Sequence, residues 1–395
     1  MVVDLSLSDH FRAFAVTVER DGGTIYPAIC RGVADDPDVL TLLDAAPPRQ
    51  RRPILLLAAV HDLLLAGADH PLAAWYDTVA AVRGTPPATP AGDVATVFAD
   101  FCRAHRAELS HLVATRSTQT NEVGRCTALF PALCAIAAAE ERGRPLSLLD
   151  LGCSAGLNLL FDQYGYTYRD PDGVVVRTAG DPGATVTLEC TVRGDPAVLP
   201  ELHSPAVAER VGLDLSPLDP RSEDAARWLL ACQWPDNPTR FRRLRAALAD
   251  VPAAPHPPRL EQGDMVDDLS GVAATVPGDH PLVVFHSWVA AYLDEARQRA
   301  LVAAVQDLGG IRPVHHLYCE APFETPGLPT PPAPVRREGP DLSTALVHIG
   351  PNGAAPVRLA DTHPHGYWIR WWPAPVTRRG PTARPGGRAP APPGP

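Results

Sequence analysis

Residues 147–158 have the residue types and the spacing of a ligand-binding turn. Asp150 stands near the end of a short apolar run, Gly152 follows it, and Gly156 comes four residues later. Glycine permits a sharp backbone bend and lets a ligand approach the main chain closely. The five residues centred on Ser154 also match the G-x-S-x-G pattern that presents a nucleophilic serine in some hydrolases. The chemistry is therefore either ligand binding at a glycine turn or nucleophilic catalysis by a serine.

The elements on either side of this turn place it at the edge of a sheet. The leucine-rich run 146–151 is typical of a strand that is buried on both faces. After Gly156, apolar residues recur at the spacing of one helix face, at Leu157, Leu160 and Tyr164. A strand, a glycine turn and a helix form the first unit of a doubly wound sheet, where ligands bind at the carboxyl ends of the strands.

The glycine pattern narrows the choice of ligand. The dinucleotide fingerprint G-x-G-x-x-G needs three glycines, and the P-loop needs a lysine, a residue that this chain lacks. Residues 149–156 instead resemble motif I of class I S-adenosylmethionine methyltransferases, with a serine where that family usually has its middle glycine. The resemblance implies that Gly152 and Gly156 line the methionine and ribose region and that Asp150 lies near the ammonium group. It extends to Cys153, Ser154 and Asn158 as cofactor-binding residues. A turn without a ligand is the alternative.

Six segments that together span most of the chain have the pattern of one known family: 56–70, 119–126, 149–158, 210–219, 227–236 and 363–371. Through these segments the chain as a whole resembles a bacterial family, the domain of unknown function numbered 2332. The resemblance implies a methyltransferase-like fold and supplies no substrate.

Three more residues are candidates for cofactor binding. Asp214 ends the predicted strand 210–215, where an acid normally binds the ribose hydroxyls. Asp170 lies at the usual spacing of about 20 residues after the glycine turn, but we prefer Asp214 because its segment has the pattern of a buried strand. By resemblance, Asp264 after the strand 259–261 contacts the adenine, or else it caps the helix that follows. Asn121, or its neighbour Glu122, is predicted to touch the ligand.

Two residues are candidates for catalysis. His286 follows the apolar strand 281–285, and Glu320 follows the strand 313–319. A histidine that titrates near neutrality can deprotonate a hydroxyl or amine nucleophile, and Glu320 is a second acid–base or substrate-binding candidate. A structural histidine bonded to a backbone group is the alternative.

These elements predict an α/β protein with a doubly wound, Rossmann-like methyltransferase sheet over residues 116–375 and an antiparallel last hairpin. A helical N-terminal cap domain, 1–115, precedes it, and a small antiparallel β insertion, about 164–205, interrupts it. The tail 376–395 is dominated by Arg, Pro and Gly and is predicted to be disordered.

The composition limits the class of partner. A net charge of -10 argues against a broad nucleic-acid-binding surface. We see no signal peptide and no apolar run long enough to span a bilayer. The eight cysteines are scattered singly, which fits neither a zinc motif nor a disulfide framework. His363 and His365 resemble a metal tract only weakly, so we expect no metal. We therefore expect a cytoplasmic protein with a small-molecule substrate.

The leading hypothesis is an S-adenosylmethionine-dependent methyltransferase with an unknown acceptor. The first alternative is a protein that binds S-adenosylmethionine or S-adenosylhomocysteine without turnover, because the middle glycine and an Asn-Pro-Pro-Tyr motif are missing. The second is a serine hydrolase that uses Ser154, with Asp264 and either His286 or His316 as its partners.

Overall fold

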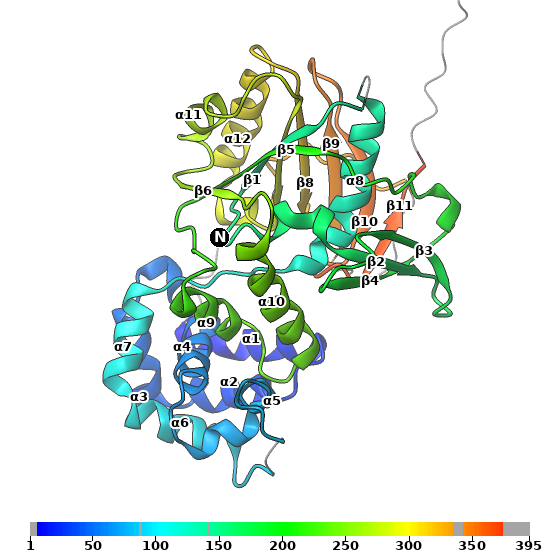
Figure 1. Cartoon of the computed structure of the whole chain (residues 1–395). Helices are drawn as coiled ribbons and strands as arrows, with labels where there is room; N and C mark the ends of the chain where they lie inside the picture. The colour runs from blue at the N-terminus through cyan, green and yellow to red at the C-terminus, as the bar shows by residue number, and fades with distance from the viewer. Residues whose placement is uncertain (1–5, 87–88, 141–142, 335–342, 374–395) are drawn as a thin grey trace, which may run out of the picture.

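The structure is a computed structural model that describes residues 6–86, 89–140, 143–334 and 343–373 (Figure 1). The predicted disordered tail, 376–395, lies outside the described residues. A group of N-terminal helices occupies one end of the molecule, and a large sheet with its covering helices occupies the other.

The N-terminal part is helical, as the sequence predicts, and it buries its own apolar cluster. The helices bury Phe11, Leu56 and Phe98 completely. Trp228, which lies about a hundred residues further along the chain, completes the same cluster. The α-helices are α1 (Leu7–Arg20), α2 (Tyr26–Ala34), α3 (Pro37–Leu40), α4 (Pro53–Leu65), α5 (Asp77–Arg83), α6 (Val94–Ala104) and α7 (Arg106–Thr115), with 3-10 turns η1 (Thr41–Ala45), η2 (Pro48–Gln50) and η3 (Pro71–Trp75).

The rest of the described chain is built on one 11-stranded sheet with the order β3-β2-β4-β11-β10-β9-β8-β7-β1-β5-β6. The strands from β6 to β8 in this order are parallel, and β9, β10 and β11 continue the sheet in antiparallel fashion. The strands are β1 (Leu146–Leu151), β2 (Gly165–Arg169), β3 (Val175–Gly180), β4 (Thr187–Val192), β5 (Val207–Asp214), β6 (Arg259–Gln262), β7 (Leu282–Ser287), β8 (Val314–Glu320), β9 (Thr344–Ile349), β10 (Val357–Thr362) and β11 (Trp368–Trp371).

Helices cover both faces of the parallel strands. On one face, Leu133 of α8 (Cys126–Ala139) belongs to the same apolar cluster as Leu148 and Phe285. On the other face, Leu301 of α12 (Glu295–Leu308) and Leu269 of α11 (Leu269–Ala274) join the cluster of Leu149 and Val284. Both faces of β1 are therefore buried, which explains its unbroken apolar run. A mixed α/β fold with a large sheet and a closing antiparallel hairpin is confirmed.

Two more helices follow β5 and lie beside the N-terminal helices in Figure 1. They are α9 (Glu223–Ala231) and α10 (Pro238–Asp250). Trp228 of α9 donates its indole N–H to the Ser117 carbonyl at 2.9 Å. These helices connect the two parts of the molecule through contacts that the order of the chain does not indicate.

The β insertion differs from the prediction. β2 and β3 form the expected antiparallel hairpin, but β4 pairs with β2 in parallel. β4 also pairs in parallel with β11, so the insertion extends the main sheet instead of protruding from it. The reason is that Leu188, Cys190 and Val192 alternate along β4 and bury one face of this strand in the main apolar cluster. In this position β4 pairs with the edge of β11, which would otherwise be left open.

The helix predicted after the glycine turn also differs. This segment is a 3-10 helix, η6 (Leu157–Gln163), with non-helical backbone angles at Leu160. The helix is short because β2 begins at Gly165. Upstream of β1, Gln119 lies outside any helix, and α8 begins at Cys126 after the 3-10 turn η4 (Val123–Arg125).

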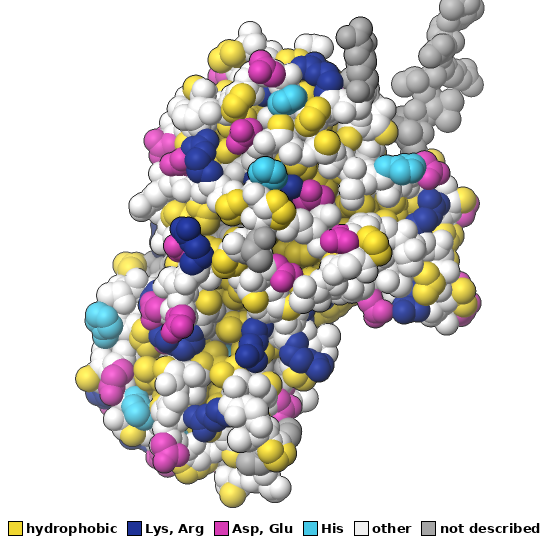
Figure 2. All heavy atoms as spheres, in the orientation of Figure 1, with side chains coloured by type: hydrophobic (Ala, Val, Ile, Leu, Met, Phe, Trp, Pro, Cys, Tyr) yellow, Lys and Arg dark blue, Asp and Glu magenta, His cyan; other side chains and the backbone are white. Residues whose placement is uncertain are grey.

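The surface in view mixes both signs of charge. Figure 2 shows arginine and acidic side chains interspersed over both parts of the molecule, with yellow apolar surface between them. None of the helices in the described residues has the length and apolar character needed to cross a membrane.

Candidate functional site

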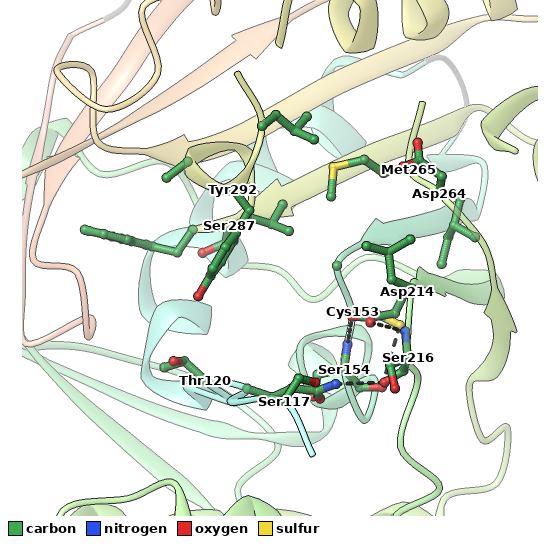
Figure 3. A pocket seen from close by; sticks show the side chains of 18 of the residues that line it. Ser117, Thr120, Cys153, Ser154, Asp214, Ser216, Asp264, Met265, Ser287 and Tyr292 are labelled. Atoms are coloured by element: carbon green, nitrogen blue, oxygen red, sulfur yellow. Dashed lines mark hydrogen bonds between the residues drawn. The ribbon is translucent and has the colours of Figure 1, made fainter. Parts of the chain in front are cut away.

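A cavity of about 1030 Å³ lies at the carboxyl ends of β1, β5, β6 and β7. The segment from Ser117 to Asn121 forms one wall, and Arg49, Gln50 and Arg52 reach it from the N-terminal helical part. In Figure 3, Tyr292 and Ser287 lie on one side of this space, and Asp214 and Ser216 lie on the opposite side. The cavity is thus built from elements that are far apart in the sequence.

Most of the predicted cofactor-binding residues line this cavity. They are Asn121, Asp150, Gly152, Cys153, Ser154, Asn158, Asp214 and Asp264. Gly156, His286 and Glu320 are not among the lining residues. Gly156 has φ +73° and precedes η6, and a Cβ atom there would lie 2.9 Å from Leu260 Cδ2. Packing of the turn, rather than the cavity, therefore requires a glycine at this position.

Asp150 is the most unusual residue of the cavity. Its side chain is 3% exposed, and it makes no hydrogen bond or ion pair with any described residue. Burial, reinforced by the nearby Asp214 carboxylate, raises the pKa of Asp150 well above its ordinary value. A buried carboxylate without a partner is unfavourable, so a cation or a hydrogen-bond donor would stabilise it.

Arg125 is the positively charged residue that acts on Asp150. Its guanidinium lowers the pKa of Asp150 and so partly offsets the effect of burial. Arg125 is 6% exposed and lines the cavity. It donates Nε to the Pro364 carbonyl and Nη1 to the Ser287 carbonyl, both at 3.1 Å. Its Nη2 makes no hydrogen bond with a described residue, so one edge of the guanidinium is available to an anion.

The glycine turn is held by the protein's own contacts. Gly152 has φ +71°, and a Cβ atom there would meet Val289 Cγ2 at 2.4 Å. Ser154 also has a positive φ, 54°, a backbone conformation that residues other than glycine rarely adopt. The Asn121 amide donates to Ser154 Oγ, and Ser154 Oγ donates to the Gln119 side chain. These bonds tie the turn to the upstream wall of the cavity.

The two predicted acids beside the turn support the backbone. Asp214 Oδ2 accepts the Ser154 N–H at 2.8 Å, and Oδ1 accepts the Ser216 N–H at 2.8 Å. Asp264 Oδ1 accepts the Val266 N–H at 2.8 Å and a bond from Arg297 at 2.5 Å. Asp264 therefore stabilises the turn before α11. This role resembles the helix cap considered as its alternative, but α11 begins only at Leu269.

The alternative acid, Asp170, lies elsewhere. Its carboxylate accepts the Asp172 and Val174 N–H groups in the β2–β3 turn, at 3.0 and 2.9 Å. It does not line the cavity. Of the two acids proposed for the ribose, only Asp214 is at the cavity.

His286 and Glu320 form a buried network behind the cavity. His286 Nδ1 lies 2.7 Å from Glu320 Oε1, and its Nε2 lies 3.1 Å from His316 Nε2. His286 pairs with Leu151 in the sheet, whereas Asp150 pairs with Phe285. Because side chains alternate along a strand, His286 and Asp150 project from opposite faces. This is why Ser287, and not His286, lines the cavity.

Glu320 has a clear positioning role. Its Oε1 also accepts the N–H groups of Val289 and Ala290, at 3.1 and 3.3 Å. These bonds support the turn after β7, where Trp288 has φ +57°, a conformation that is strained for a residue with a large side chain.

Several residues of the cavity wall were not predicted from the sequence. Ser287 Oγ and Trp288 Nε1 are buried, line the cavity and have no hydrogen-bond partner among the described residues. Tyr292 is 57% exposed, and the Arg52 guanidinium lies 5.6 Å from the centre of its ring. Their position directly after a predicted strand end was the available signal for Ser287 and Trp288. The sequence held no comparable signal for Arg52.

The geometry gives little support to a serine hydrolase. Ser154 Oγ is bonded to Asn121 and Gln119, and Asp264 is bonded to Arg297. His286 and His316 contact each other behind the cavity. The three residues of a Ser-His-Asp arrangement must form a chain of hydrogen bonds, and these candidates do not.

Other chemistry is also unsupported in the described residues. They contain no group of three or more His, Cys, Asp or Glu residues placed to bind a metal. All eight cysteines lie within the described residues and are free thiols; Cys232 is partly exposed and the others are buried.

The fold and the cavity define a mixed α/β protein with a candidate ligand site at the carboxyl ends of its parallel strands. The chain belongs to the family described as "Uncharacterized protein conserved in bacteria (DUF2332)", whose model matches residues 8–371. A comparison with curated proteins finds no match. A solved structure described as "Conversion of a Disulfide Bond into a Thioacetal Group during Echinomycin Biosynthesis" is 15% identical, covers 59% of this chain and 76% of that chain, and has a TM-score of 0.23. A likeness at this TM-score supports no conclusion about function.

Proposed function

We propose that this protein is an S-adenosylmethionine-dependent methyltransferase that acts on a small molecule. The observation that carries the proposal is the unpartnered, buried carboxylate of Asp150 in a cavity that Arg125 also lines. An α-amino acid group carries one ammonium and one carboxylate. Asp150 and Arg125 offer it one partner of each sign, and both partners are buried, where charge-assisted hydrogen bonds are strong.

The remaining walls fit the rest of this cofactor. Next to Asp150, the ends of β5 and β6 contribute Asp214, Leu215 and Met265 to the cavity. In Figure 3, Met265 and Asp264 lie above Asp214 on the same side of the space. We assign the adenosine part to this side, with Met265 and Leu215 as the apolar surface for a flat base.

The protein has a limited task in the reaction. S-adenosylmethionine supplies, when bound, a methyl group on a positively charged sulfur. The chain must then bind the acceptor in line with that group and exclude water, which is where most of the rate enhancement of such a transfer arises. Ser287 and Trp288 lie where they could orient the acceptor through their unpartnered Oγ and Nε1. His286 cannot contact an acceptor in this arrangement, so we propose that it acts only through Glu320 and the turn after β7.

Calorimetric titration tests the proposal. We expect the wild-type protein to bind S-adenosylmethionine and S-adenosylhomocysteine, and we expect Asp150→Asn to weaken binding about tenfold or more. Asp170→Asn is the matched control, because Asp170 lies in the β2–β3 turn outside the cavity. No binding by the wild type, or equal binding by Asp150→Asn, would overturn the proposal.

A binding protein without turnover is the second candidate. It is favoured by one observation, namely that neither predicted catalytic residue, His286 or Glu320, lines the cavity. Formation of S-adenosylhomocysteine in the presence of a panel of small-molecule acceptors separates the two candidates. Binding without any product across that panel would favour the non-catalytic function.

A further inference from the structure

The mouth of the cavity contains two arginines without partners. Arg49 of η2 and Arg52, which precedes α4, both line the cavity. Neither makes an ion pair or a side-chain hydrogen bond with any described residue, although Arg52 stacks on Tyr292 at 5.6 Å. Between them, Arg51 is engaged, because it donates to the carbonyls of Ala46 and Asp44, both at 3.1 Å. Of these three arginines, the two that line the cavity are thus the ones left unpaired.

The opposite side of the mouth differs, because its arginine is already paired with acidic side chains. Arg297 binds Asp264 at 2.5 Å and Asp267 at 2.9 Å. All three of these residues line the cavity. At the mouth, the arginines without an ion-pair partner among the described residues are therefore Arg49 and Arg52, on the side of Tyr292 and Ser287.

The third observation is a donor-only group. The Trp288 indole can only donate, and its buried Nε1 has no partner. It therefore calls for an acceptor atom, such as the oxygen of an anion. The cavity of about 1030 Å³ is at the upper limit for a single small ligand. It leaves room for a second small molecule beside the nucleoside.

We infer that the Arg49–Arg52 side of the cavity binds the methyl acceptor, and that this acceptor is a small molecule with an anionic oxygen group, a carboxylate or a phosphate. Arg49 and Arg52 bind the anion, Tyr292 provides an aromatic wall, and Ser287 and Trp288 contact the part of the acceptor nearest the methyl donor. This inference rests on the proposed function and specifies its substrate class.

Probe titrations test the inference with three compounds of similar shape: benzoate, phenyl phosphate and the neutral benzamide. Saturation-transfer NMR and calorimetry measure their binding to the wild type with and without S-adenosylhomocysteine. We expect benzoate or phenyl phosphate to bind and benzamide to bind about tenfold more weakly or not at all. Whichever anion binds more tightly, benzoate or phenyl phosphate, identifies the anionic group of the acceptor as a carboxylate or a phosphate.

Variants locate the site. Arg52→Gln and Arg49→Gln should each reduce the affinity for the anion about tenfold. Both variants should keep an affinity for S-adenosylhomocysteine within about twofold of the wild-type value. Arg299→Gln is the control, since Arg299 pairs with Glu295 on the outside of α12 and does not line the cavity. Equal binding of benzamide, no binding of either anion, or anion binding unchanged in both variants would overturn the inference. Failure of the proposed function would be seen separately, as no binding of S-adenosylhomocysteine by the wild type.

Discussion

The carboxylate of Asp214, at the end of β5, accepts the backbone N–H of Ser154 in the glycine turn at 2.8 Å, and its other oxygen accepts the Ser216 N–H at 2.8 Å. The acid that the sequence suggests for ribose binding therefore connects the ends of two neighbouring strands. It can reach a ligand from the cavity wall, but its first role is to fix the shape of the turn.

This double role leads to a prediction for Asp214. Asp214→Ala should reduce the free energy of unfolding by about 1–3 kcal/mol, because two backbone N–H groups lose their partners. Asp214→Asn, which keeps one acceptor oxygen, should cost less. Urea unfolding measures the stability, and calorimetry measures the affinity for S-adenosylhomocysteine. A loss of affinity in Asp214→Ala with unchanged stability would show that Asp214 acts on the ligand alone.

A second prediction concerns the stability of the ligand-free protein. Burial raises the pKa of Asp150 above its ordinary value of 3.8, so its ionisation costs stability as the pH rises above 3.8 towards the folded-state pKa. Asp150→Asn removes this ionisation. We expect its unfolding temperature at neutral pH to rise by about 2 °C, which corresponds to roughly 1 kcal/mol.

The wild type and Asp150→Asn should converge in unfolding temperature as the pH falls towards 3.8, where the carboxyl is protonated in both the folded and unfolded states. Differential scanning calorimetry from neutral to acidic pH makes the comparison. A variant that is less stable than the wild type at neutral pH would show that Asp150 has a stabilising partner in solution.

A third prediction concerns Glu122, which connects the segment before α8 to α10. It is 3% exposed and pairs with Arg240 at 2.7 Å and Arg243 at 2.5 Å. Burial by itself would raise the pKa of the Glu122 carboxyl. The two guanidiniums outweigh this effect and lower the pKa to about 2. The folded-state pKa lies below the ordinary value of 4.5, so the stabilisation is present above pH 4.5 and is lost as the pH falls towards 2.

The size of this effect is on the order of 3 kcal/mol. Glu122→Gln should therefore be less stable than the wild type at neutral pH, and the difference should shrink on acidification. Glu295→Gln is the control, because Glu295 forms an exposed pair with Arg299 that should contribute little. Urea unfolding between pH 7 and the lowest pH at which the chain remains soluble measures both. A pH-independent difference would argue against the charge as its cause.

A fourth prediction separates positioning from acid–base catalysis at Glu320. Its Oε1 lies 2.7 Å from His286 Nδ1 and accepts the N–H groups of Val289 and Ala290. Glu320→Gln keeps an oxygen that can accept the two backbone bonds, and it should keep most of the ligand affinity and any turnover. Glu320→Ala should lose about tenfold in ligand affinity through the displaced Trp288 turn. Loss of turnover in Glu320→Gln with unchanged affinity would instead assign an acid–base role to this residue.

Much of the sheet was predictable from local sequence. The apolar run 146–151 and the run that includes Val283 and Phe285 are β1 and β7, because strands buried on both faces need nearly continuous apolar residues. The hairpin of β9 and β10 follows from two short apolar segments around Asn352, which has φ +61°. The glycine turn was also predictable from the sequence. The structure explains why Gly152 is needed there, because a side chain at this position would collide with Val289.

The sequence by itself determined which segments form strands and which polar residues end them, because those patterns depend on neighbours a few positions away. Only the tertiary structure decided which side chains share the cavity. The register of β1 and β7 places Ser287 on the face of Asp150 and turns His286 away. Likewise, Arg52 contacts Tyr292, which lies in the last third of the described chain. Register and long-range packing depend on many contacts at once, and no local pattern records them.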